Sequence, residues 1–181
     1  MISLDRIKEA HNKILPYINY TPLIYSDFLS QNRNVKLKLE SLQKTGSFKL
    51  RGALNKLLSL SDEKKNNGVI AVSTGNHGKG VAYASSLLGI KSTIYMSSMV
   101  PKYRKEAIQA LGAKVEIVGK NSDEADLYAK NISKKENITL IHPFDDEDII
   151  AGQGTIGLEM IKDFPDVDTV IIPTSGGGLI G

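Results

Sequence analysis

One lysine stands where a strand-like run gives way to a helical one, a setting that changes the chemistry of its amine. Residues 35–39 alternate apolar with polar side chains, a polar turn containing Thr45-Gly46-Ser47 follows, and helical spacing begins near Lys49. Partial burial and the positive end of a helix both disfavour the ammonium form. The neutral amine that results is the form that Schiff-base chemistry requires. A solvated lysine on a helix face would have the same local pattern.

A second polar segment, residues 73–80, separates a strand-like run ending at Val72 from a helical run. Its sequence is Ser-Thr-Gly-Asn-His-Gly-Lys-Gly, so hydroxyls, an amide and backbone N–H groups meet at a helix N-terminus. This arrangement suits an anion such as a carboxylate. The alternative is an ordinary capped turn, in which Ser73 or Thr74 satisfies free N–H groups of the helix.

The third segment is glycine-rich and ends the chain. It runs from Pro173 to Gly181 and follows residues 169–172, which we predict to be the last strand. The three consecutive glycines 176–178 allow backbone N–H groups to curl around a phosphate. The segment matches neither the Walker pattern nor the GxGxxG dinucleotide fingerprint. A flexible tail is the alternative interpretation.

Short β-rich runs alternate with helical periods along the whole chain, which predicts βαβ units, a parallel sheet and an α/β fold class. Asn121 followed by Glu124 is a capping-box start for one helix. The predicted strands are 35–39, 69–72, 92–96, 114–118, 138–141 and 169–172, and the predicted helices are 2–15, 49–58, 77–88, 101–112, 121–135 and 148–162.

Composition excludes several classes of protein. The 181 residues carry a net charge of +3 without a clustered basic face, which argues against nucleic-acid binding. No run approaches the roughly 18 apolar residues of a membrane span, and we expect a cytoplasmic protein. The absence of cysteine excludes disulfides and thiolate metal sites. His11 and His142 lack metal-ligand spacing, and the acidic run 145–148 is interpreted as a solvated helix start rather than a cation site.

Four blocks in order resemble the fold-type II pyridoxal-phosphate enzymes, in the threonine dehydratase and serine racemase branch. The blocks are SLQKTGSFKLRGA (41–53), STGNHGKGVAYA (73–84), HPFDDEDIIAGQGTIGLEM (142–160) and IIPTSGGGLIG (171–181). The resemblance implies a tryptophan synthase beta-like fold of parallel sheets flanked by helices. It assigns residues 1–50 and 146–181 to an incomplete larger cofactor domain and residues 51–145 to a smaller α/β domain.

The resemblance also implies roles for individual residues. Lys49 takes the position of the Schiff-base lysine that moves the substrate's α-proton, and Phe48 packs beside the cofactor. Asn76 hydrogen-bonds the ring hydroxyl of pyridoxal 5'-phosphate. No residue is assigned to a metal. The substrate carboxylate is assigned to Ser73, Thr74, Gly75, Asn76 and His77, and the cofactor phosphate to Ser175, Gly176, Gly177, Gly178 and Leu179.

The implied activity converts L-threonine or L-serine to a 2-oxo acid and ammonia. A serine racemase or a related hydroxyamino-acid lyase is the nearest alternative, and a non-catalytic small-molecule-binding fragment or regulatory half comes from another class. Thr74 stands where racemases carry serine and many dehydratases carry alanine, and Ser175 stands where the branch commonly has glycine. Thr74 weakens the racemase interpretation without removing it.

The chain stops directly after its glycine-rich loop, and this leads to an expectation about activity. In a βαβ design a glycine-rich loop leads into a helix that covers the sheet, but the chain stops at Gly181. The resemblance implies a longer protein, homo-oligomeric at full length, whose remaining part supplies a partner for the pyridine nitrogen. We therefore expect the 181 residues alone to be inactive.

Overall fold

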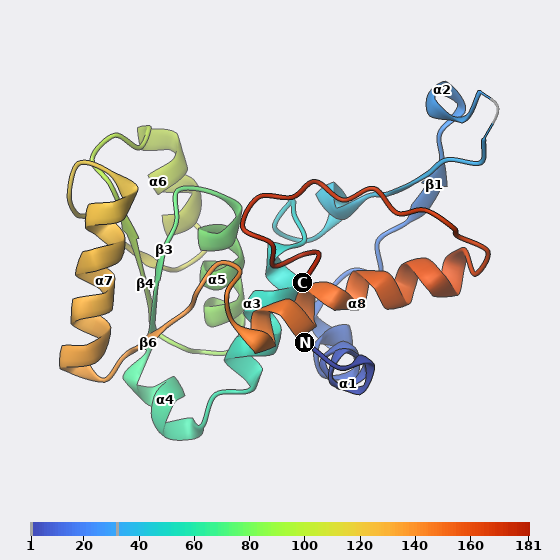
Figure 1. Cartoon of the computed structure of the whole chain (residues 1–181). Coiled ribbons are helices and arrows are strands. Elements are labelled where there is room, and N and C mark those ends of the chain that lie inside the picture. Colours follow the sequence, from blue (N-terminus) through green and yellow to red (C-terminus); the bar gives the residue numbers. More distant parts are fainter. Residues whose placement is uncertain (1, 32) are drawn as a thin grey trace.

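A computed structural model describes residues 2–31 and 33–181 of the chain. It has an α/β architecture built around a four-stranded parallel sheet in the order β5-β4-β3-β6 (Figure 1). The strands are β3 (Val69–Val72), β4 (Ser92–Met96), β5 (Lys114–Ile117) and β6 (Thr139–Leu140). The register pairs Val69 with Ser92 and Thr93 with Lys114. The predicted α/β class with a parallel sheet is confirmed.

Helices cover both faces of this sheet because its central strand is apolar on both sides. Val69 and Ala71 belong to the main core, whereas Ile70 between them packs in a second cluster with Tyr95 and Ala129. This alternation follows from the two-residue period of a strand. In Figure 1, α7 lies on one face and α5 with α6 on the other. Their bounds are α5 (Asn76–Leu87), α6 (Lys102–Gln109) and α7 (Ser122–Glu136).

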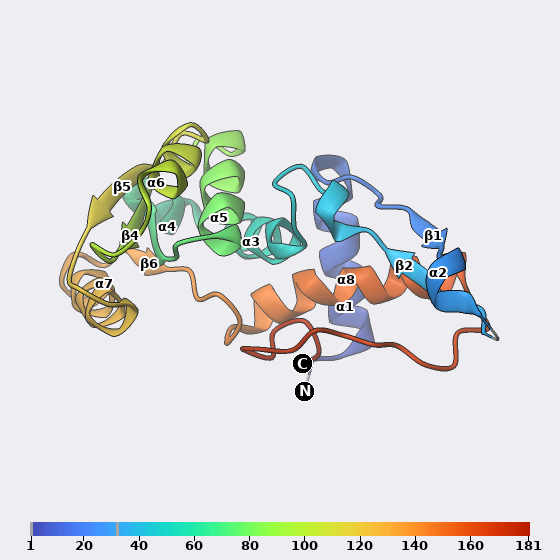
Figure 2. The same ribbon diagram turned by 90° about the horizontal axis from the view of Figure 1, so that it is seen from above.

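A second group of helices packs beside the sheet and carries the lysine segment. The first residue of α3 is Lys49, and Leu50, Leu54 and Leu57 of that helix are fully buried. Figure 2 shows α3 between α5 on one side and α1 with α8 on the other. The bounds are α1 (Leu4–Ile14), η1 (Leu15–Tyr17), α3 (Lys49–Leu58), α4 (Asp62–Asn67) and α8 (Glu147–Asp163).

An antiparallel hairpin projects from the body of the molecule (Figures 1 and 2). Its strands pair Leu23 with Lys38 and Tyr25 with Lys36. The tip is exposed, and Phe28 there is 86% accessible to solvent. Its elements are β1 (Leu23–Tyr25), α2 (Asp27–Ser30) and β2 (Lys36–Lys38), and η2 (Glu40–Leu42) follows.

The prediction of a last strand at 169–172 is wrong. These residues are not in a strand, and Ile171 is 93% exposed. An apolar run becomes a strand only when a neighbouring strand accepts and donates its backbone hydrogen bonds. None of the described strands pairs with it, and the segment instead runs back along α8 (Figures 1 and 2). No helix within 2–31 and 33–181 has the length and apolar character that crossing a membrane requires.

Candidate functional site

Lys49 has the environment that its position at a strand-to-helix junction predicts. It opens α3, it is partly buried, and its Nζ donates a hydrogen bond to the carbonyl oxygen of Pro143 at 2.8 Å. The Phe48 ring lies alongside, with 5.2 Å between the ring centroid and Nζ. Burial lowers the pKa of Lys49 below that of an ordinary lysine. A larger share of this amine is therefore neutral at a given pH than in a solvated lysine.

The 73–80 segment forms the turn between β3 and α5. The Ser73 Oγ accepts hydrogen bonds from the N–H groups of Gly75 at 3.2 Å and Gly78 at 2.9 Å. Gly75 is the N-cap of α5 and supplies no side-chain cap, and Asn76 is the first helical residue. Capping by Ser73 and a free helix N-terminus thus coexist here, so neither interpretation of the segment excludes the other.

This turn also borders a basic cavity of about 330 Å³. Arg104 of α6 reaches towards it and donates to the carbonyl oxygen of Thr74 at 3.5 Å. The cavity is lined by Thr74, Gly75, Asn76, Lys79, Tyr103, Arg104 and Ile108.

The side chain of His77 points away from the turn into the protein. It is only 5% exposed, and its Nε2 lies 2.9 Å from the carbonyl oxygen of Ile141. Because a carbonyl oxygen only accepts, Nε2 carries the hydrogen. Burial lowers the pKa of His77 to about 4, so the ring is neutral near pH 7. Only the backbone N–H of His77 is left to serve the turn.

The glycine-rich segment folds against Phe144. A β-carbon on Gly178 would stand 2.7 Å from the Cα of Phe144 and 2.9 Å from its carbonyl oxygen. Gly177 has a φ of +88°, a conformation that glycine adopts without strain. The carbonyl oxygen of Gly177 accepts hydrogen bonds from the N–H groups of Ile180 at 3.0 Å and Gly181 at 2.9 Å. The segment is therefore a tight turn rather than an extended tail.

Two residues that the sequence analysis did not single out join the lysine to the glycine turn. Pro143 accepts the hydrogen bond of Lys49, and Phe144 next to it contacts the glycine turn. Their sequence signals are the break in pattern between the short strand before His142 and the helix after Asp146, and their place in the block 142–160. Three segments far apart in the chain, those of Lys49, His77 and the glycine turn, thus meet at the Ile141–Phe144 segment.

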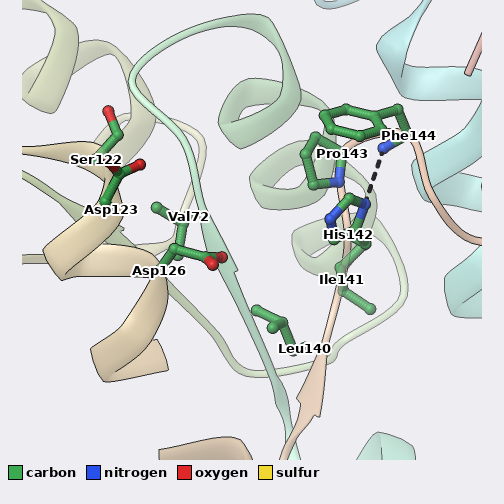
Figure 3. Close-up of a pocket in the computed structure, with 9 residues that line it drawn as sticks. All are labelled: Val72, Ser122, Asp123, Asp126, Leu140, Ile141, His142, Pro143 and Phe144. Atoms are coloured by element: carbon green, nitrogen blue, oxygen red, sulfur yellow. Dashed lines mark hydrogen bonds between the residues drawn. The ribbon is translucent and has the colours of Figure 1, made fainter. Parts of the chain in front are cut away.

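A cavity of about 250 Å³ adjoins the same segment, at the carboxyl ends of β3 and β6. Figure 3 shows the His142 ring beneath Phe144, whose N–H lies 3.4 Å from His142 Nδ1. The N–H of Asp145 also donates to this nitrogen, at 2.8 Å. The cavity is lined by Val72, Ser122, Asp123, Asp126, Leu140, Ile141, His142, Pro143 and Phe144.

A buried ion cluster fixes the helix that carries Lys49. The guanidinium of Arg51 is fully buried and pairs with Glu159 at 2.6 Å and with Glu40 at 2.8 Å. Lys38 reaches Glu159 at 2.6 Å from the other side. The cluster ties α3 to α8 and to the hairpin, which sets the position of Lys49 two residues away. Arg51 lies within the block 41–53, but no spacing in the sequence reveals its partners.

The acidic run 145–148 is a helix start, as predicted. Asp146 caps α8 by accepting from the N–H groups of Asp148 at 2.9 Å and Ile149 at 3.2 Å. Lys56 pairs with Asp146 at 2.7 Å and with Asp148 at 3.2 Å, and Arg6 pairs with Glu147 and Asp148. Lysine and arginine thus neutralise these carboxylates. Across the described residues, no group of three or more His, Cys, Asp or Glu side chains is arranged to hold a metal ion.

Comparison with known proteins extends over almost the whole chain. A profile of the family described as pyridoxal-phosphate dependent enzyme matches residues 14–181. The curated L-threonine dehydratase catabolic TdcB of Staphylococcus aureus (strain USA300) is 50% identical over 183 residues, covering 99% of this chain and 53% of the relative. The chain therefore spans about half the length of the curated relatives it matches.

Solved structures give the same relationship. The structure of maize serine racemase matches with a TM-score of 0.94 and 35% identity, covering 99% of this chain and 55% of that one. The processed form of threonine deaminase isoform 2 from Solanum lycopersicum matches with a TM-score of 0.91 and 39% identity, covering 98% and 51%.

The residues present fit the group that this family binds. The partly buried amine with its lowered pKa suits an aldehyde, and the glycine turn, which is too tight for a side chain, suits a phosphate. The start of α5, where the N-cap Gly75 supplies no side chain, suits a carboxylate. The chain belongs to the pyridoxal-phosphate dependent enzyme family.

Proposed function

We propose that this chain provides the lysine-bearing part of a pyridoxal-phosphate-dependent ammonia-lyase that acts on L-threonine or L-serine. The observation that carries the proposal is the partly buried amine of Lys49, which lies beside the Phe48 ring and against the segment contacted by the glycine turn. The 50% identity to a catabolic L-threonine dehydratase supports this choice of reaction.

The roles proposed for individual residues are those that the resemblance implies, and their surroundings support them. Lys49 holds the cofactor, and its amine, once free and neutral, takes the proton from the substrate's α-carbon. The N–H groups at the start of α5, with Ser73, Thr74 and Asn76, hold the substrate carboxylate and direct the α-hydrogen towards Lys49. The turn from Ser175 to Leu179 supplies N–H groups to the cofactor phosphate. When bound, pyridoxal phosphate supplies an electron sink for the α-carbon.

The proposed division of the chain accounts for where these residues lie. Residues 51–145 contain the whole parallel sheet and would form the smaller domain, whereas 1–50 and 146–181 would belong to the larger one. Lys49 and the glycine turn then come from the larger domain, and the 73–77 turn comes from the smaller one. We further propose that the full-length protein is a homo-oligomer.

Serine racemase activity is the second candidate. The match to maize serine racemase, with a TM-score of 0.94, favours it, whereas Thr74 in the turn before α5 weakens it without removing it. A racemase must deliver a proton to the face of Cα opposite the lysine, and a threonine hydroxyl is a group of the right kind. Chiral analysis of serine after incubation separates the two, since only a racemase returns the D-enantiomer.

The test combines labelling with turnover. The chain is incubated with pyridoxal phosphate and reduced with borohydride, and the modified lysine is mapped by mass spectrometry, with Lys49→Ala as the control. Release of ammonia and a 2-oxo acid from L-threonine and L-serine is then measured. Label confined to Lys49 together with product supports the lyase. Label without product supports the cofactor role of Lys49 and agrees with the expectation that the 181 residues alone are inactive. Scattered label that persists in the Lys49→Ala variant contradicts the proposal.

A further inference from the structure

Two helices of the site donate hydrogen bonds to one short segment. Lys49, at the start of α3, donates to the carbonyl oxygen of Pro143 at 2.8 Å, and His77, at the start of α5, donates to that of Ile141 at 2.9 Å. The N–H of Ile141 still bonds to Ile70 O at 2.8 Å, so the segment leaves the sheet just after this residue. The His77 bond therefore lies at the last point where the segment is tied to the sheet.

The imidazole of His77 is suited to a permanent structural bond. It is 5% exposed, and its Nδ1 has no hydrogen-bond partner in the part of the chain that the structure describes. Burial, with smaller contributions from the charges of Lys49 and His142, lowers its pKa to about 4. The ring stays neutral above that pH, and its Nε2–H stays committed to Ile141 because the carbonyl can only accept.

We propose that His77 is a positioning residue for Lys49. The His77 ring holds the Ile141–Pro143 segment in place, and the carbonyl of Pro143 holds the lysine amine in its partly buried position. This inference rests on the proposed role of Lys49 as the cofactor lysine. It adds to the expected contact between residue 77 and the substrate carboxylate, which the backbone N–H of His77 can make while the ring serves the segment. Without the His77 bond, the segment moves away and water reaches the amine.

The pKa of Lys49 can be used to detect loss of the His77 bond, because few charges act on either residue. Burial alone lowers the pKa of Lys49, and no carboxylate contributes to the shift. The titratable side chains whose charges act on the His77 ring are Lys49 and His142. The ring itself is uncharged near pH 7. Loss of the ring therefore removes no charge from the site. A rise in the pKa of Lys49 reports its exposure to water, because loss of the Pro143 hydrogen bond by itself would lower that pKa.

The experiment measures the reactivity of the Lys49 amine without cofactor or substrate. The 181-residue chain is labelled with trace acetic anhydride across a pH series, and acetylation at each lysine is quantified by mass spectrometry. In the original chain the acetylation of Lys49 should begin at a lower pH than that of an ordinary, solvated lysine. In His77→Leu its curve should move up by about one pH unit, towards an ordinary lysine. His77→Gln, whose amide N–H can replace Nε2–H, should restore the original curve.

Controls separate positioning from general damage. Ser85→Ala removes another buried polar group from α5, one whose Oγ also lacks a partner in the described residues, and should leave the Lys49 curve unchanged. Labelling is done well below the melting temperature of each variant, because unfolded molecules expose Lys49 and would themselves move the curve towards an ordinary lysine. If His77→Leu does not fold, His77→Met takes its place. An unshifted curve in the apolar variant, or equal shifts in the apolar and glutamine variants, overturns the proposal.

The outcome is independent of the proposed reaction. If Lys49 captures no pyridoxal phosphate but its acetylation curve shifts in His77→Leu and returns in His77→Gln, the proposed function fails and the positioning role stands. If Lys49 captures the cofactor but its acetylation curve is the same in His77→Leu and His77→Gln, the proposed function stands and the positioning role fails.

Discussion

Gly52 of α3 and Gly152 of α8 meet so closely that a β-carbon on Gly152 would stand 2.6 Å from the Cα of Gly52. The first residues of α3 carry Lys49, and α8 begins just after the segment that accepts its hydrogen bond. The distance between the two helices therefore sets the distance between the lysine and Pro143. Close packing of two backbones explains why both positions are glycine.

Gly152→Ala should destabilise the chain by about 1–3 kcal/mol, because the added methyl group must push α3 and α8 apart. Urea denaturation followed by circular dichroism measures the loss. Gly157→Ala in the same helix is the matched control, since a β-carbon there meets nothing within 4 Å. That change should stabilise the chain by roughly 0.5–1 kcal/mol through helix propensity. Equal effects of the two substitutions would contradict the packing argument.

Arg51→Met should cost about 3–5 kcal/mol, because it leaves the carboxylates of Glu40 and Glu159 without their shared guanidinium. Arg51→Lys keeps the charge but not the planar fork that reaches both partners, so its loss should be smaller. The comparison variant is Lys130→Met, which breaks an exposed pair with Asp126 and should cost about 0.3–0.5 kcal/mol. Free energies of unfolding from urea titrations decide the ranking, and a loss in Arg51→Met as small as in Lys130→Met refutes it.

Stability should fall in acid partly through Glu159. Burial would raise the pKa of this carboxyl, but hydrogen bonds from Arg51 and Lys38 outweigh burial and hold the pKa below its usual value. A carboxyl whose folded-state pKa is depressed stabilises the fold above its unfolded-state pKa, and that contribution is lost as the pH falls through the folded-state value. The loss should begin below about pH 4.5.

Glu159→Gln has no charge to titrate at this position. Its melting temperature should be lower than that of the original chain near neutrality, and it should depend less on pH below about pH 4.5. An acid dependence as steep as that of the original chain would show that other carboxyls account for it.

Gly177→Ala should weaken capture of pyridoxal phosphate at Lys49. A residue with a β-carbon pays about 1–2 kcal/mol at a φ of +88°, and the turn relaxes to a conformation that aims its N–H groups elsewhere. The concentration of pyridoxal phosphate for half-maximal borohydride-fixed labelling should rise roughly five- to thirty-fold. Gly89→Ala introduces the same strain at a φ of +68° in a turn after α5, and it should leave that concentration unchanged.

Local sequence patterns predicted the elements well because their causes are local. The predicted helix start at Asn121 is confirmed, with Glu124 N donating to the Asn121 side chain at 2.9 Å, although the Glu124 carboxylate accepts from the N–H of Lys120 rather than that of Asn121. The fully apolar run 69–72 is a strand covered on both faces, as predicted. Short pieces such as β1 and α2 were not predicted, because three or four residues carry too little periodicity to be recognised.

The errors and omissions involve contacts between distant residues. The run 169–172 has the composition of a strand, but composition does not say which strand pairs with it. Lys49 was recognised from its junction, whereas Pro143 was missed because its backbone carbonyl, not its side chain, makes the contact. Arg51 was likewise missed as an anchor, since its carboxylate partners lie 11 and 108 positions away.

The burial that lowers the pKa of Lys49, beside Pro143, also depends on when Pro143 is synthesised. The two residues are 94 positions apart, and a ribosome adds about 5–20 residues per second, so Lys49 waits roughly 5–19 s for its acceptor to be made. During that interval the amine is solvated and mostly protonated, a poor nucleophile towards the free aldehydes of the cell. The lowered pKa arises only with the folded site, so modification of the nascent chain at Lys49 should be slow.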